Sequence, residues 1–106
     1  GRRERNSAGS TSFCDALLSP MPGELTFAIN RQNLAGALAV SDGEVAAAMR
    51  AAFAALKLVI EPGGAAALAG VLSGKLEHRG KTIVVVASGG NVDPALFSDV
   101  LRQKVP

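Results

Sequence analysis

The sequence is short of aromatic residues and of cysteine, and each shortage excludes a class of protein. It holds four Phe and no Trp or Tyr, which removes the stacking platform that proteins binding single-stranded nucleic acid use. The net charge is only +2, and Arg2, Arg3, Arg5 and Lys104, four of the eleven basic residues, lie close to the two ends of the chain. The single cysteine, Cys14, cannot form a disulfide within the chain and has no Cys or His neighbour at metal-ligand spacing. We therefore expect no nucleic-acid partner, no metal site and a reducing, cytoplasmic location.

Long apolar runs are absent as well. The longest uncharged stretch, residues 62–74, is mostly Gly and Ala, and it falls short of the roughly 18 apolar residues that a membrane-spanning helix needs. The opening GRRER is not followed by the apolar region of an export signal. The sequence therefore predicts neither a membrane partner nor export.

Small apolar side chains are abundant. Of the 106 residues, 48% are hydrophobic and 19% are charged, which is rich for a single small domain with much surface to keep wet. We expect part of this apolar surface to meet another chain, so a homo-oligomer is predicted. Residues 1–12 are polar and without periodicity, and they are predicted to be an irregular N-terminal segment before one α/β domain over residues 13–106.

Local signals place the first clear helix. Ser41-Asp-Gly-Glu44 matches a capping box, in which the Ser and Glu side chains satisfy free amides at a helix start. Residues 38–40, just before it, are compatible with a short strand. The apolar residues that follow recur at helical spacing and are predicted to share one face: Val45, Met49, Ala52, Phe53 and Leu56.

Two further helices have proline at their first turn. Pro62 is suited to open a small-sided helix that runs on through residues 65–72, because proline lacks the N–H that a helix start leaves free. Asp93 is expected to cap a last helix from Pro94 to about Gln103. Residues 13–33 are predicted to form loops and short extended or helical pieces.

The strongest strand signal is residues 82–87, TIVVVA. Its run of β-branched residues is typical of a strand covered on both faces. It leads directly into Ser88-Gly89-Gly90-Asn91. Open α/β folds bind ligands where a strand ends and a helix begins, and the two glycines permit positive φ and a close approach of backbone to ligand. An ordinary turn between strand and helix is the alternative, and the pattern leaves both open. Glu61 precedes a glycine-rich helix start. Considered by itself, its carboxylate is expected to cap the free amides of that helix.

Three signatures in order carry a resemblance to a known family. They are SDGEV before a helix, LVIEPGGAA, and VVVASGGNVD, and an earlier string, CDALLSPMPGELTFAINRQNLAG, agrees with them. From Ser12 to about Leu101 the sequence resembles the C-terminal part of the threonine dehydratase and serine racemase family, the fold-type II pyridoxal phosphate enzymes. The resemblance implies a fragment of an α/β cofactor-binding domain, with few strands and about four helices.

The resemblance also implies roles for the site residues. Ser88 would face the pyridine nitrogen of the cofactor, with Glu61 near the same edge of the ring, while Gly89, Gly90 and Asn91 would shape the loop beneath it. A hydroxyl cannot hold a proton on that nitrogen as a carboxylate does, so the ring is a weaker electron sink, which suits β-elimination from L-Thr or L-Ser better than transamination.

The family's Schiff-base lysine has no counterpart here. The four lysines, Lys57, Lys75, Lys81 and Lys104, do not occur in the family's lysine motif. We therefore expect a fragment of a threonine dehydratase-like lyase that is inactive alone and has no catalytic residue of its own. It is expected to bind no pyridoxal phosphate covalently. Its predicted partner is a complementary N-terminal portion or further copies of the same chain in a homo-oligomer. The alternative is a non-enzymatic α/β module for assembly or for binding a small phosphorylated ligand at the Ser88 turn.

Overall fold

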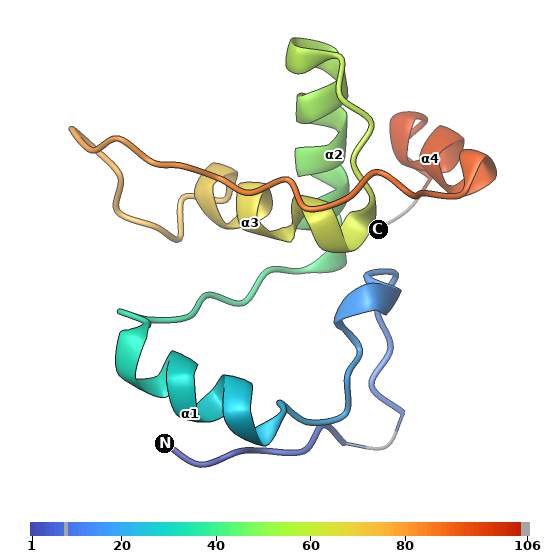
Figure 1. Cartoon of the computed structure of the whole chain (residues 1–106). Helices are drawn as coiled ribbons and strands as arrows, with labels where there is room; N and C mark the ends of the chain where they lie inside the picture. Colours follow the sequence, from blue (N-terminus) through green and yellow to red (C-terminus); the bar gives the residue numbers. More distant parts are fainter. Residues whose placement is uncertain (8, 105–106) are drawn as a thin grey trace.

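All regular elements of the structure, a computed structural model that describes residues 1–7 and 9–104, are helical (Figure 1). The prediction of about four helices is confirmed. The prediction of a few strands is wrong, since no strand forms among the described residues. In chain order the elements are the 3-10 helix η1 (Asp15–Leu17) and the α-helices α1 (Glu24–Asn33), α2 (Asp42–Leu56), α3 (Pro62–Leu72) and α4 (Pro94–Leu101).

Helix α2 begins where the capping box predicts. The Ser41 hydroxyl accepts from the Glu44 N–H at 3.3 Å, and the Glu44 carboxylate accepts from the Ser41 N–H at 2.7 Å. The helix ends at Leu56, and the next residue, Lys57, adopts the left-handed conformation with φ 60°. The predicted apolar face is buried over its first three turns and exposed at Phe53 and Leu56.

Helices α3 and α4 also begin as predicted. Pro62 is the first residue of α3. The Asp93 carboxylate accepts from the N–H groups of Ala95 and Leu96 at 2.9 and 3.0 Å and so caps α4. Helix α4 ends at Leu101, two residues earlier than expected.

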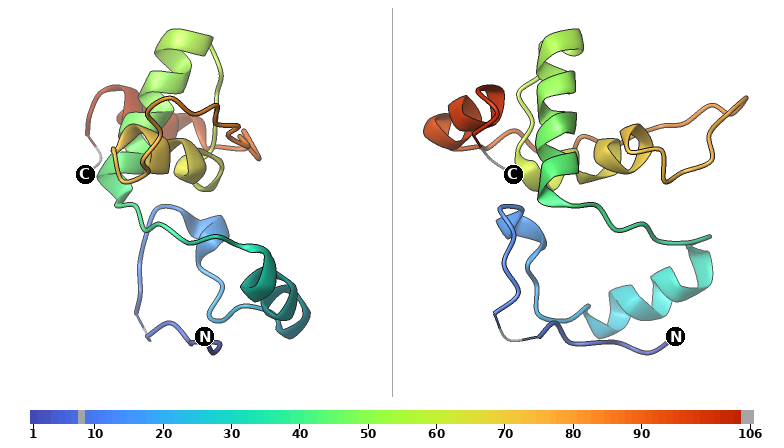
Figure 2. Two further views of the ribbon diagram at one scale, coloured as in Figure 1. Left: turned by 90° about the vertical axis from the view of Figure 1, so that its left-hand side faces the viewer. Right: turned by 180° about the vertical axis from the view of Figure 1, so that it is seen from behind.

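The core lies where α2 crosses α3, with α4 against α2 (Figures 1 and 2). Small side chains make this close packing possible. The side chains of Met49 and Val45 from α2 and Val100 from α4 are the largest that are fully buried. Phe53 and Phe97 add an edge-to-face pair with ring centroids 5.5 Å apart. The complete set of buried hydrophobic residues is Cys14, Val45, Ala46, Ala48, Met49, Ala52, Ile60, Ala65, Ala69 and Val100.

The N-terminal third forms a separate layer in Figure 1, below the α2 and α3 pair. Residues 1–7 run beside residues 19–24, where Asn6 donates to Pro20 and the Arg3 guanidinium pairs with Glu24 at 2.8 Å. Residues 13–33, predicted as short pieces, include the ten-residue helix α1. The Ser12 hydroxyl ties this layer to α2 by donating to the Asp42 carboxylate at 2.5 Å.

The segment predicted to be a buried strand is largely exposed. Val84 and Val86 are 87% and 70% exposed, and the backbone N–H and C=O groups of residues 82–87 form no hydrogen bond with any described residue. A strand needs a neighbouring chain to complete its hydrogen bonds, and the described residues supply none here. Residues 38–40 are irregular for the same reason.

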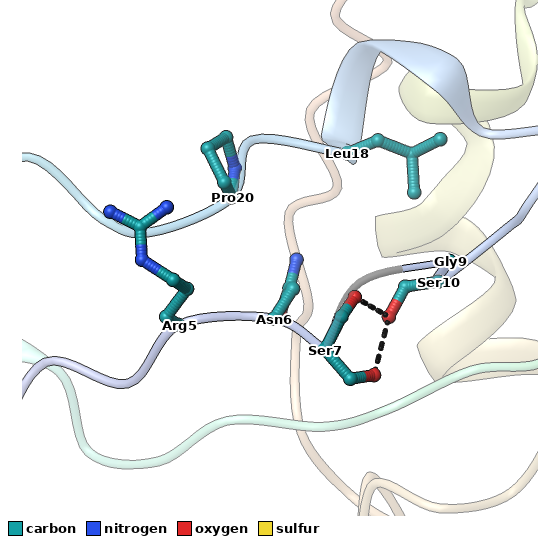
Figure 3. Close-up of a pocket in the computed structure, with 7 residues that line it drawn as sticks. All are labelled: Arg5, Asn6, Ser7, Gly9, Ser10, Leu18 and Pro20. Carbon is teal, nitrogen blue, oxygen red and sulfur yellow. Dashed lines mark hydrogen bonds between the residues drawn. The ribbon is translucent and has the colours of Figure 1, made fainter.

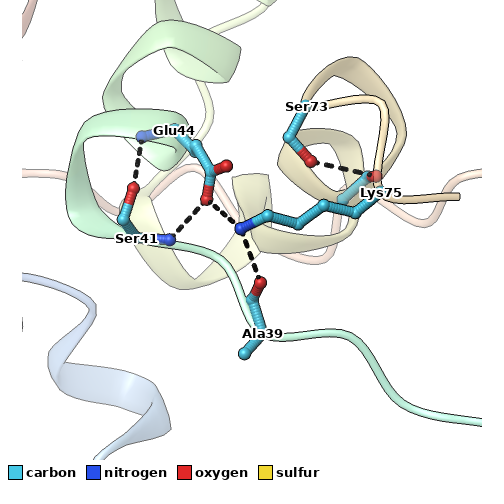
Figure 4. A network of polar contacts seen from close by, with 6 residues as sticks. Ala39, Ser41, Glu44, Ser73 and Lys75 are labelled. Carbon is cyan, nitrogen blue, oxygen red and sulfur yellow. Dashed lines mark hydrogen bonds and ion pairs between the residues drawn. The ribbon is translucent and has the colours of Figure 1, made fainter.

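A network of polar contacts holds the segment that precedes α2 (Figure 4). The Lys75 ammonium donates to the Ala39 carbonyl at 2.9 Å and to the Glu44 carboxylate at 2.8 Å. The hydrogen bond from Lys75, together with that from the Ser41 backbone, lowers the pKa of the Glu44 carboxyl from its ordinary value of 4.5. The loop after α3 is thereby joined to the start of α2.

We expect this network to contribute to stability at neutral pH and to be lost in acid. Because the pKa of Glu44 is lower in the folded chain than in the unfolded chain, its contribution is present above pH 4.5 and disappears as pH falls through the folded-state pKa. Urea unfolding of wild type and Glu44→Gln at several pH values should show a difference in the free energy of unfolding that shrinks below pH 4.5. Lys75→Met should remove most of the same dependence. A difference that grows toward acid pH would contradict this role.

Among the described helices, none has both the length and the apolar character needed to cross a membrane.

Candidate functional site

The structure brings two of the predicted site residues, Glu61 and Gly89, into direct contact. The Glu61 N–H donates to the Gly89 carbonyl at 3.0 Å. This bond places the Ser88 turn across the N-terminus of α3, where Glu61 occupies the N-cap position. The Glu61 side chain makes no cap hydrogen bond, so the capping role considered for this carboxylate is not what the structure shows.

The glycines of the turn serve close packing within the chain. A Cβ on Gly89 would overlap the Glu61 carboxylate, and a Cβ on Gly90 would lie 2.7 Å from the Val59 carbonyl oxygen. On the other side of the contact, a Cβ on Gly64 would lie 2.8 Å from the Gly89 carbonyl oxygen. Neither Gly89 nor Gly90 has positive φ, so that expectation is wrong and close approach is the reason for glycine at these positions.

The turn is open to solvent on its other side. Ser88 and Asn91 are exposed, while Glu61 and Gly89 are half-buried. Within the part of the chain that the structure describes, the Ser88 hydroxyl has no hydrogen-bond partner and the backbone N–H groups of residues 88–91 donate to none. A hydroxyl and free amides are therefore available together at one solvent-facing edge.

A further neighbour of this edge, helix η1, was not predicted from the sequence. Helix η1 packs against the start of α3, and a Cβ on Gly63 would lie 3.3 Å from the Ala16 side chain and 3.5 Å from Leu17. The sequence does not reveal this contact, since Leu17 and Gly63 are 46 positions apart and no periodic pattern links them. The 3-10 turn thus forms a second wall beside the Glu61 and Gly89 contact.

Three of the four lysine side chains are hydrogen-bonded away from the Ser88 turn. Lys57 donates to the Ala54 carbonyl at 2.8 Å, Lys81 donates to the Glu77 carbonyl at 3.2 Å, and Lys75 belongs to the network at the start of α2. Lys104 follows α4. None of these four side chains is hydrogen-bonded to Ser88 or Glu61 in the described part of the chain.

A surface cavity of about 280 Å³ lies in the N-terminal layer and is separate from the Ser88 turn (Figure 3). The Ser10 hydroxyl lies 3.1 Å from the Ser7 hydroxyl and donates to the Ser7 carbonyl at 3.0 Å. No predicted site residue lines this cavity, whose described lining is Arg5, Asn6, Ser7, Gly9, Ser10, Leu18 and Pro20.

Comparison with known proteins gives a family for this arrangement. The family described as "Pyridoxal-phosphate dependent enzyme" matches residues 1–89, which end within the Ser88 turn. The chain belongs to this family. Pyridoxal phosphate is therefore the cofactor of the intact family, and the predicted resemblance is confirmed.

Curated relatives agree with the family and differ in length. The L-threonine ammonia-lyase of Thermotoga maritima is 33% identical over 97% of this chain, which spans 25% of that protein. The serine racemase of Dictyostelium discoideum is 32% identical over 96% of this chain, which spans 32% of that protein. The chain thus spans about a quarter to a third of the length of these relatives.

A solved structure supports the fold. The crystal structure of a threonine deaminase from T.th. matches with a TM-score of 0.78 and 36% sequence identity, and the match covers 87% of this chain and 31% of that one. The helical arrangement described above is thus that of a fold-type II pyridoxal-phosphate dependent enzyme over the shared region.

The residues present suit one edge of the cofactor of this pyridoxal-phosphate dependent family. Ser88 offers an unpartnered, exposed hydroxyl, which can hydrogen-bond a ring nitrogen. Gly89 and Gly90 have no side chains, and a Cβ on either residue would meet the Glu61 carboxylate or the Val59 carbonyl oxygen. The turn can therefore lie directly against Glu61. The Ser88 hydroxyl thus suits a hydrogen bond to the ring, and none of the residues 61 and 88–91 has an amine that could bind the cofactor covalently.

Proposed function

We propose that residues 61 and 88–91 form one wall of the pyridoxal phosphate site of a cytoplasmic threonine ammonia-lyase-like enzyme that acts on a small hydroxy amino acid. The observation that supports this most is the Glu61 N–H to Gly89 carbonyl bond, which fixes the turn and leaves the Ser88 hydroxyl free and exposed. The names of the matched relatives, ammonia-lyase and racemase, supply the substrate class.

In this proposal the Ser88 hydroxyl would hold the pyridine nitrogen by donating a hydrogen bond to it, and as a neutral group it would leave that nitrogen without a proton. When bound, pyridoxal phosphate supplies the electron sink for chemistry at the α-carbon of an amino acid. A neutral serine would keep that sink weak, and a weak sink suits the loss of a β-hydroxyl group better than transamination. Glu61 acts through its backbone and its contact with Gly89, and it positions the turn.

The wall is incomplete as a catalytic site. Covalent chemistry of this kind needs an activated lysine beside the cofactor, and no lysine side chain is hydrogen-bonded to Ser88 or Glu61 in the described part of the chain. We therefore propose that a complementary portion supplies the lysine. This portion would correspond to the part of the relatives' length that the chain does not span.

Amide chemical shifts test where the cofactor binds. In ¹⁵N-labelled chain titrated with pyridoxal phosphate, we expect the largest shifts at Ser88–Asn91 and Glu61, because those amides are free or flank the ring edge. Ser88→Ala should weaken the binding by roughly tenfold, the effect of losing about one hydrogen bond to a buried ligand group.

Inorganic phosphate is the matched control. Phosphate alone should leave residues 88–91 unshifted. If phosphate and pyridoxal phosphate shift these amides equally, the turn is an anion site and the ring assignment fails. If neither ligand shifts them and the shifts fall in another element, the proposed wall is wrong.

A further inference from the structure

The Asp42 carboxylate joins the first turn of α2 to the segment that precedes η1. One of its oxygens accepts from the Ser12 hydroxyl at 2.5 Å, and the other accepts from the Phe13 N–H at 3.3 Å. The Ser12 oxygen in turn accepts from the Cys14 N–H at 3.0 Å. Residues 12–14 are thus held, directly or through Ser12, by one carboxylate that lies 30 positions further along the chain than Ser12.

Helix α2 does not need these bonds for its own start. Its capping box is complete without Asp42, because the side chains of Ser41 and Glu44 each accept from the other residue's N–H. The Asp42 side chain is half-buried and accepts from the earlier segment instead. Hydrogen bonds to a carboxylate are roughly twice as strong as those between neutral groups. The arrangement therefore serves the segment before η1.

The chain passes from this anchor directly into η1. Cys14, the residue before η1, is only 6% exposed and belongs to the core. On its other side η1 packs against the first turn of α3, and in Figure 1 it is the blue turn below that helix. No hydrogen bond joins η1 to α3 among the described residues. The place of η1 beside α3 therefore depends on packing and on the anchor at Ser12.

The first turn of α3 also holds the Ser88 turn. Helix η1 contacts it at Gly63, where a Cβ would lie 3.3 Å from the Ala16 side chain. Two residues earlier, the Glu61 N–H donates to the Gly89 carbonyl at 3.0 Å. A displacement of η1 would therefore remove a packing contact from the helix start that fixes the turn.

We propose that Asp42 and Ser12 are positioning residues, which hold η1 against the start of α3 and thereby fix the Ser88 turn for its ligand. The inference rests on the proposed function, since it gives that site its second wall. Neither residue is assigned a contact with the cofactor, and both act through η1. Their removal should therefore weaken cofactor binding without abolishing it.

The nuclear Overhauser effect between the Leu17 methyl groups and the Gly63 α-protons measures the position of η1 without any ligand. We expect it in wild type, since a Cβ on Gly63 would lie 3.5 Å from the Leu17 Cγ. Ser12→Ala should reduce it by more than half, because the Asp42 carboxylate loses its shortest bond to the segment. Ser12→Thr, which keeps the hydroxyl, should restore it. Thr11→Ala is the matched control, since Thr11 is the exposed hydroxyl residue next to Ser12.

Titration of the same variants with pyridoxal phosphate connects η1 to the site. Measured from the amide shifts of residues 88–91, the dissociation constant should rise roughly three- to tenfold in Ser12→Ala, the effect of losing about one hydrogen bond. Asp42→Ala should act like Ser12→Ala, while the threonine variant and the control should match wild type. The contact between the rings of Phe53 and Phe97, whose centroids lie 5.5 Å apart, reports that the core of each variant is folded.

Two results would overturn the positioning role. One is a contact between Leu17 and Gly63 that is absent from wild type or survives Ser12→Ala. The other is a cofactor affinity that stays at the wild-type value after the contact is lost, or that falls equally in Thr11→Ala. If wild type shows the contact but no cofactor shift at residues 88–91, the proposed function fails instead, and the contact alone decides whether Ser12 anchors η1.

Discussion

Gly64→Ala is expected to lower the free energy of unfolding by about 1–3 kcal/mol, the usual cost of overpacking a close contact. The new Cβ would lie 2.8 Å from the Gly89 carbonyl oxygen and 3.0 Å from its nitrogen. Both are backbone atoms, so the overlap cannot be relieved by a side-chain rotation. The Ser88 turn would have to move away from α3, and the Glu61 to Gly89 hydrogen bond would lengthen. Thermal and urea unfolding followed by circular dichroism measure the loss.

Gly70→Ala is the control within the same helix. Its Cβ would meet only the end of the Leu38 side chain, at the ordinary contact distance of 3.6 Å. Alanine favours a helix interior over glycine by roughly 1 kcal/mol, so this variant should be as stable as wild type or more stable. Equal losses from both variants would show that α3 tolerates no added methyl group and that the contact with Gly89 has no special importance.

Deamination of L-threonine is expected to be absent from the chain alone. With saturating pyridoxal phosphate, ammonia release should match that of free pyridoxal phosphate, whereas an intact relative such as the Thermotoga maritima enzyme should exceed it by a factor of about 10⁶ or more. The reason is that catalysis needs the electron sink and an activated amine in one site. Lys57, Lys75 and Lys81 donate to carbonyls or carboxylates away from Ser88.

The chain's own variants serve as controls for this assay. Lys57→Met, Lys75→Met and Lys81→Met should each leave the background rate unchanged. The account would be contradicted if the chain released ammonia well above the background and one of these substitutions abolished that release. Such a result would identify a reactive lysine within these residues.

The helices were predictable because their signals are local. The capping box at Ser41, Pro62 at the first turn of α3 and Asp93 before α4 each act within about four residues, and all three mark helix starts in the structure. The strand predicted at residues 82–87 does not form, because a strand needs a neighbouring chain and β-propensity alone does not provide one. Its residue types suit a sheet, but without a pairing partner the hydrogen bonds stay unmade.

The candidate site was predictable in its members and only partly in its arrangement. The resemblance named Glu61 and the Ser88 turn, and the structure joins Glu61 to Gly89 by a hydrogen bond. The reason for the glycines was misjudged: they accommodate Glu61, Val59 and α3, and they do not adopt positive φ. Packing of η1 against Gly63 is a long-range contact that no sequence spacing indicates.

Borohydride trapping tests the central assignment most directly. The chain is incubated with pyridoxal phosphate, reduced with borohydride, dialysed, and digested for mass spectrometry. If residues 88–91 form only the non-covalent wall of the site, no lysine should carry the reduced cofactor in stoichiometric amount. One cofactor per chain on a single lysine, retained through dialysis and lost in Ser88→Ala, would show that the amine is part of this chain and would contradict the assignment.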